Sequence, residues 1–110
     1  MASVDLQLRK GVLEIAVLAQ LDRCPTYGGD LLETLGKASA LEISQGTLYP
    51  LLSRLNKAKL VATTWKESPV GPPRKYYELT KKGRTHLNEL TQSWRQLTAA
   101  VEDILEGNDD

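Results

Sequence analysis

The segment 44–57 constrains the fold of this chain more than any other stretch. Its leucines follow the i, i+3, i+4, i+7 spacing of a helix with one apolar face: Leu48, Leu51, Leu52 and Leu55. The other face is polar, aromatic and basic, with Thr47, Tyr49, Ser53 and Arg54. The pattern predicts a helix that is capped by Ser44 and packs its leucines on a core.

A strand, a loop and a second strand are predicted directly after this helix. Residues 60–66 are rich in β-branched and aromatic side chains, which favour a strand. Residues 67–74 contain three prolines and one glycine, which favour a loop. Residues 75–80 return as a strand, so we expect a β-hairpin with a basic tip formed by Arg74 and Lys75.

Three further helices complete the predicted order: 6–21, 27–37 with Thr26 as its N-cap, and 81–106 capped by Thr80. These elements are those of a winged helix-turn-helix, a mainly α (α+β) fold with a long C-terminal dimerisation helix. We expect a DNA-binding domain at 1–80, the dimerisation helix at 81–107 and a frayed tail at 108–110.

The charge distribution favours nucleic acid as a partner. The chain has 14 basic and 14 acidic residues, yet residues 54–84 hold nine basic and two acidic ones. A local basic region can bind phosphate although the whole chain is neutral. Because the third helix of this fold enters the major groove, we expect double-stranded DNA as the partner. The candidate DNA-contacting residues are Gln45, Thr47, Tyr49, Ser53, Arg54, Arg74 and Lys75.

The last predicted helix carries a narrow apolar stripe. Its apolar residues are spaced 3, 4, 3, 4, 3, which is the period of a coiled-coil seam: Leu87, Leu90, Trp94, Leu97, Val101 and Ile104. The stripe predicts a homodimer, which would present two reading helices to a palindromic operator. The alternative is that the helix packs on the chain's own first helix.

Trp94 lies in the middle of this stripe, where its bulk suits a tight coiled coil poorly. It could hold two helices apart and leave an aromatic-walled slot for a small planar ligand. Glu14 could face the same slot and favour a cationic ligand. The alternatives are an interface tryptophan without a ligand and a Glu14 that points to water.

A set of short motifs runs through the chain in order: residues 8–11, Tyr27-Gly28, residues 46–52 with Arg54-Leu55, residues 73–77 with Leu79-Thr80, and Gly83-Arg84. In these motifs the chain resembles the PadR family of bacterial transcriptional regulators in its short form. It implies a homodimeric winged-helix repressor, commonly of detoxification or efflux genes. In multidrug-sensing members a tryptophan like Trp94 stacks planar aromatic compounds, and the first helix lines the pore. That would place Lys10, Glu14 and Leu18 beside Trp94.

Two positions depart from the family pattern. Pro72 stands where a basic residue is usual in the wing, which is the predicted β-hairpin with its loop, and Gly29 stands where a larger, often aromatic, residue is common. The first departure bears on how the wing binds phosphate. The second bears on any contact that a side chain at position 29 would make.

Other classes of function find little support in the sequence. One histidine and one cysteine form no arrangement of nucleophile, base and orienting group, so we expect neither an enzyme nor a cofactor. A metal sensor using Cys24 and His86, a regulator that senses no small molecule, and a protein-interaction module remain as alternatives. No apolar run approaches about 18 residues and no secretion signal precedes the first helix, so we expect no membrane association. The lone Cys24 favours the cytoplasm.

Overall fold

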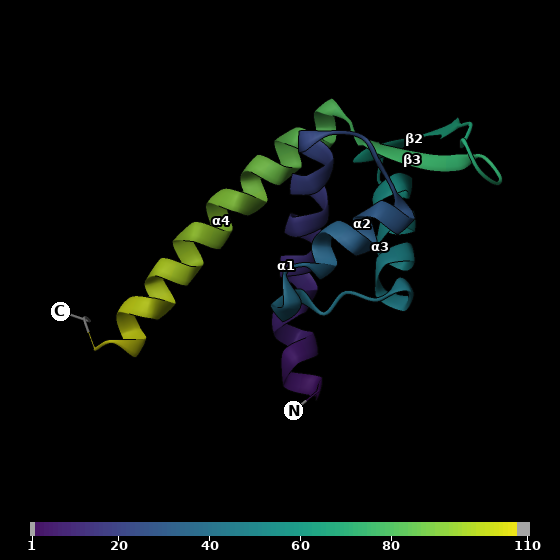
Figure 1. Ribbon diagram of the computed structural model, residues 1–110. Coiled ribbons are helices and arrows are strands. Elements are labelled where there is room, and N and C mark those ends of the chain that lie inside the picture. Colours follow the sequence, from purple (N-terminus) through teal and green to yellow (C-terminus); the bar gives the residue numbers. More distant parts are fainter. Residues whose placement is uncertain (1, 108–110) are drawn as a thin grey trace.

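The computed structural model describes residues 2–107, and confirms the winged-helix α+β fold (Figure 1). The elements in chain order are α1 (Ala2–Arg23), β1 (Thr26–Tyr27), α2 (Gly28–Gly36), the 3₁₀ turn η1 (Ser39–Leu41), α3 (Gln45–Lys57), β2 (Val61–Lys66), β3 (Arg74–Leu79) and α4 (Lys81–Leu105). The tail 108–110 lies outside the described residues.

The short strand β1 corrects the prediction that Thr26 caps α2. Thr26 is buried and pairs with Tyr77 of β3, and its hydroxyl donates to the Cys24 carbonyl at 2.9 Å. Tyr27 therefore occupies the N-cap position of α2, without a side-chain cap. The pairing with β3, about fifty residues later, decides the conformation here.

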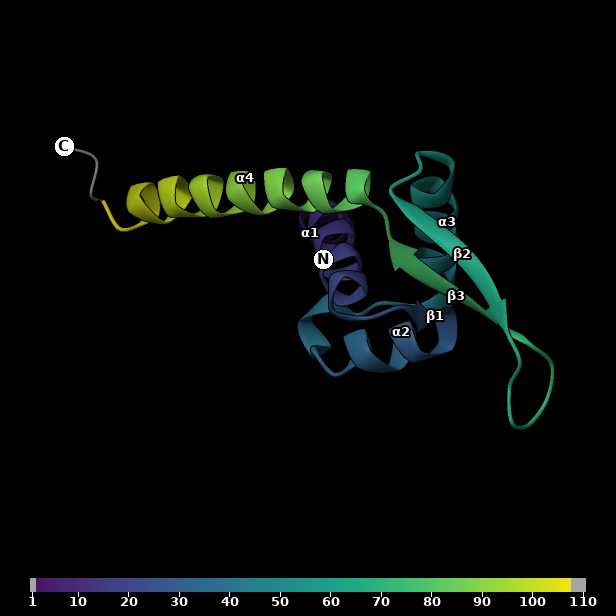
Figure 2. The ribbon, with the colours of Figure 1, turned by 90° about the horizontal axis from the view of Figure 1, so that it is seen from above.

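The three strands form an antiparallel sheet in the order β1-β3-β2. In the hairpin, Val61 pairs with Leu79, Thr63 with Tyr77 and Trp65 with Lys75. Since alternate residues share a face, Val61, Thr63 and Trp65 point the same way. The hairpin extends past α3, on the other side of the molecule from the free end of α4 (Figure 2).

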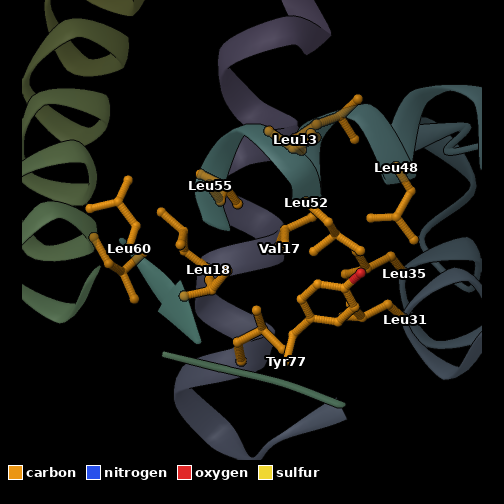
Figure 3. Packing of buried hydrophobic residues seen from close by; sticks show 14 residues of the cluster. Leu13, Val17, Leu18, Leu31, Leu35, Leu48, Leu52, Leu55, Leu60 and Tyr77 are labelled. Carbon is orange, nitrogen blue, oxygen red and sulfur yellow. The ribbon is translucent and has the colours of Figure 1, made fainter. Parts of the chain in front are cut away.

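The core lies where α1, α2 and α3 meet the inner face of the hairpin (Figure 3). Its fully buried side chains include Val17 and Leu18 of α1, Leu31 of α2 and Leu52 of α3. Burying a leucine completely contributes roughly 1.5–3 kcal/mol, so these contacts fix the orientation of α3. The predicted apolar face of α3 is confirmed, because Leu48, Leu51, Leu52 and Leu55 are all buried.

Helix α4 begins on a side-chain cap and a close backbone approach. The Thr80 hydroxyl accepts a hydrogen bond from the Gly83 amide at 3.0 Å, which confirms Thr80 as the cap, and donates to the Lys59 carbonyl at 2.7 Å. A Cβ on Gly83 would stand 2.0 Å from the Leu60 carbonyl oxygen. Glycine is therefore required where α4 crosses the start of β2.

The second half of α4 leaves the body of the molecule (Figure 1). The radius of gyration is 16.0 Å, whereas a compact domain of this length has about 13 Å. Leu87 is buried in the core, but Leu97, Val101 and Ile104 are exposed. The apolar stripe thus has two parts: its first turns pack on the body of the chain, and its later turns are left exposed by the residues that the structure describes.

Candidate nucleic-acid interface

The outer face of α3 carries exposed side chains that can meet DNA. Gln45, Thr47, Tyr49 and Ser53 are all exposed, because the four leucines turn the opposite face inward. Ser44 holds the N-cap position, but its hydroxyl lies 3.2 Å from Thr47 Oγ1 and makes no backbone cap bond. The expected side-chain cap is thus replaced by a bond that orients Thr47.

Tyr49 is positioned by a glycine on α2. A Cβ on Gly28 would stand 2.5 Å from the Tyr49 hydroxyl oxygen, so the glycine lets the ring lie against α2 in this position. Burial raises the pKa of Tyr77 above its ordinary value, and the neighbouring Tyr49 raises it further. The contact with α2 holds Tyr49 at the surface beside the hairpin.

The basic residues of the hairpin lie over aromatic rings. The Arg74 guanidinium is 4.5 Å from the centre of the Tyr27 ring, Lys66 Nζ is 4.8 Å from Tyr76, and Lys75 Nζ is 5.7 Å from Tyr77. The loop 67–73 contains no lysine or arginine, so the expected basic tip is instead a basic strand end. Arg74 and Lys75 also border a hollow with Tyr49 of α3. The rings under these two cations favour this position.

Arg54 and Glu14, which sequence reasoning assigned to different sites, are partners. Arg54 Nη2 donates to Glu14 Oε1 at 2.6 Å, and His86 Nε2 lies 2.9 Å from Glu14 Oε2. This carboxylate therefore joins α1 to both α3 and α4. It does not point freely to water. The Arg54 side chain stays 61% exposed, which leaves donors for a phosphate.

The pKa of Glu14 has opposing causes. Burial raises it, but the hydrogen bonds from Arg54 and His86 outweigh burial and hold the pKa below its ordinary value. A depressed pKa means that the unfolded chain takes up the proton at higher pH than the folded one. The ionised carboxylate therefore stabilises the fold above the unfolded pKa. That contribution is lost as pH falls through the folded pKa.

Replacing Glu14 by Gln should remove this contribution. At pH 7 we expect Glu14→Gln to lower the free energy of unfolding by about 1 kcal/mol, because Arg54 is largely exposed and its bond is screened. The difference from the wild type should shrink as pH falls toward 4. Urea unfolding at both pH values and one chain concentration measures it. Glu42→Gln, which removes the exposed partner of Arg9, is the control. A pH dependence equal to that of the wild type would contradict the assignment.

A separate apolar groove runs between α1 and α4. It has a volume of about 520 Å³. Its lining residues are Leu8, Gly11, Val12, Ile15, Leu90, Ser93, Trp94, Leu97, Thr98, Val101 and Glu102. Trp94 is 42% exposed there, so the groove is open on the side away from the chain.

The first-helix residues that were expected beside Trp94 lie elsewhere. Leu18 is fully buried in the core, Glu14 is bonded to Arg54, and Lys10 borders a hollow with Thr47 and Pro50 of α3. The helix is turned so that Leu8, Gly11, Val12 and Ile15 face Trp94 instead. Their 3–4 residue spacing is visible in the sequence, but α1 is apolar on several faces and periodicity does not choose between them.

Within the part of the chain that the structure describes, no group of three His, Cys, Asp or Glu side chains is arranged to hold a metal ion. Among the same residues, no helix is both long and apolar enough to cross a bilayer.

Comparisons with known proteins agree with this geometry. Residues 17–89 match the family model described as "Transcriptional regulator PadR-like family". A PadR-like transcriptional regulator from Bacillus cereus is 41% identical, with a TM-score of 0.81, over 90% of this chain and 96% of that one. A PadR family transcriptional regulator from Eggerthella lenta is 39% identical, with a TM-score of 0.85, over 96% of this chain and 91% of that one. An uncharacterised protein of Lysinibacillus sphaericus is 25% identical over 89% of this chain and 92% of its own.

Proposed function

Because this chain belongs to the PadR-like family of transcriptional regulators, we propose that it is a homodimeric repressor whose release from a palindromic operator is triggered by a small planar ligand. The observation that carries the DNA-binding part is the exposed polar face of α3 beside the basic end of the hairpin. The dimer and the ligand rest on the uncovered stripe of α4 and on the groove at Trp94.

The DNA contacts follow from which residues are exposed. With α3 in the major groove, Gln45, Thr47 and Ser53 reach base edges or phosphates, and Tyr49 packs on a thymine methyl or bonds a phosphate. Arg54 holds a backbone phosphate with the donors that Glu14 leaves free. Arg74 and Lys75 bind phosphates at the adjacent minor groove, so they fix position more than sequence.

The homodimer covers the free half of α4. Large apolar side chains exposed along one stripe are unusual on a monomer and mark an interface. A second copy packed on Leu97, Val101 and Ile104 removes them from water. The same packing encloses the groove at Trp94 from its open side.

The ligand proposal rests on the composition of the groove. One wall is an indole ring and most of the rest is aliphatic, which suits a flat apolar molecule. Glu102 borders the groove, so it takes the role of favouring a cationic ligand that Glu14 was expected to have. A ligand bound between two copies changes the angle of the α4 helices and the spacing of the α3 helices. The ligand weakens operator binding only to the extent that it binds the changed conformation more tightly than the DNA-binding one.

The DNA-binding function is tested by selecting duplexes from a random pool on the purified protein. Fluorescence anisotropy then compares the selected duplex with an unrelated duplex of equal length. We expect roughly 10³-fold tighter binding to the selected duplex at physiological salt. Equal affinities at all salt concentrations would contradict a sequence-reading function.

Arg74→Ala should weaken binding to every duplex and reduce its dependence on salt. Each lost phosphate contact lowers the slope of log affinity against log salt by about 1. Anisotropy titrations at several salt concentrations measure the slope. Lys37→Ala, at the end of α2, is the matched control for loss of one positive charge. An Arg74→Ala slope equal to the wild-type slope would exclude the contact.

Trp94→Ala should weaken the binding of planar cationic dyes. The indole supplies the flat wall of the groove, and stacking on it contributes about 1 kcal/mol or more beyond simple burial. Dye fluorescence titrated with protein measures the affinity, which we expect to fall at least about tenfold. If the variant and the wild type bind every dye equally, the groove is not the ligand site.

A further inference from the structure

Trp65 is a large apolar side chain that the fold leaves in water. It lies on β2 and is 65% exposed. An exposed tryptophan leaves a large apolar surface in water, since such a side chain typically buries about 150–250 Å² when it is packed. In the sequence, Trp65 indicates only a strand and no role in binding.

The face on which Trp65 lies is the inner face of the hairpin. Val61 and Tyr77 on this face are buried in the core. Trp65 and its partner Lys75 lie two residues beyond the Thr63–Tyr77 pair, outside the core. The inner face therefore continues outward as an apolar ring beside a cation. The hairpin extends past α3 at this end (Figure 2).

This continuation forms one wall of a cleft. The cleft has a volume of about 380 Å³ and runs between Tyr49 on one side and Trp65, Arg74 and Lys75 on the other. Gly29 also borders the cleft and adds no side chain to it. The walls are thus aromatic and basic, which complements a chain of sugars and phosphates.

The position of the cleft in the proposed complex selects its occupant. In a duplex, the sugar–phosphate backbone of one strand separates the major groove from the neighbouring minor groove. With α3 in the major groove and the hairpin over the minor groove, that strand passes between Tyr49 and Trp65. We propose that this cleft takes the DNA backbone, with the Trp65 indole packed on a deoxyribose and Lys75 on the adjoining phosphate. The inference rests on the proposed DNA binding and adds a contact residue to it.

The affinity test uses the duplex selected from the random pool and an unrelated duplex, the second at low salt. Trp65→Ala should lower the affinity for both about tenfold, because a sugar is present at every base sequence. Trp65→Phe should restore most of the loss. Val70→Ala is the control and should bind as the wild type does, because Val70 is an even more exposed apolar residue of the same hairpin that does not line the cleft.

A direct readout comes from protein labelled with 5-fluorotryptophan. It gives one ¹⁹F signal each for Trp65 and Trp94, and Trp65→Phe assigns them by loss of one signal. On saturation with the selected duplex, the Trp65 signal should shift and lose most of its H₂O/D₂O solvent effect, as expected for a ring that becomes covered.

The outcomes separate this inference from the proposed function. If selection on the wild-type protein enriches no duplex, the DNA-binding proposal itself is overturned. A wild type that binds while the Trp65 signal keeps its solvent effect would overturn the cleft contact alone. A loss of affinity in Trp65→Ala that is confined to the selected duplex would assign the ring to a base edge and overturn the backbone contact.

Discussion

Leu97→Glu is expected to convert the protein to a monomer at micromolar concentration and to weaken operator binding by about 100-fold or more. Leu97 is 66% exposed in the single chain, so the substitution leaves the fold of each copy intact. In a dimer, two glutamates would enter an apolar seam, and burying unpaired charge is costly. Loss of the second α3 removes the avidity of paired half-sites, which is worth about 10²–10⁴-fold.

Light scattering and anisotropy on the selected duplex measure the two effects together. Gln96→Glu is the matched control, because it adds the same charge to the neighbouring exposed position, which does not belong to the apolar stripe. We expect it to remain a dimer. A Leu97→Glu protein with the mass of a dimer would show that the stripe on α4 is not the interface.

Gly83→Ala is expected to lower the free energy of unfolding by about 3 kcal/mol, the upper end of the usual cost of overpacking. The added Cβ would stand 2.0 Å from the Leu60 carbonyl oxygen and 2.7 Å from Leu79 Cδ1. The first of these is a backbone atom of the residue just before β2, so it cannot move aside by a change of rotamer. Either α4 shifts or the turn before β2 opens.

Thermal and urea unfolding at one chain concentration measure the loss, which we expect to lower the melting temperature by roughly 10 °C or more. The control is Gly36→Ala, where a Cβ meets nothing within 4 Å. It should leave stability unchanged or raise it slightly, because alanine favours a helix. A Gly83→Ala protein as stable as this control would contradict the close approach.

The parts of the fold that sequence reasoning predicted are those that local pattern determines. The leucine spacing of α3 and the cap at Thr80 both act within a few residues, and both were found as expected. The strand β1 was missed because two residues have no periodicity. Its conformation comes from pairing with Tyr76 and Tyr77.

The parts of the site that were missed depend on contacts between distant residues. Arg54 and Glu14 are forty positions apart, and no local sequence pattern predicts that a carboxylate of α1 contacts α3. Lys10 and Leu18 were placed at the groove because a helix that is apolar on several faces does not reveal its rotation. The apolar spacing of α4 places Trp94 within the stripe, but the neighbours of Trp94 on α1 are visible only in the packed structure.

In the proposed complex, two copies of α3 and the hairpin read DNA as a symmetric pair. A hydroxyl-radical footprint of the wild type on the selected duplex tests this arrangement most directly. We predict two equal protected regions related by two-fold symmetry, with centres about 10 base pairs apart or a multiple of that spacing. A single protected region without a symmetric partner, or no protection at any concentration, would contradict the account.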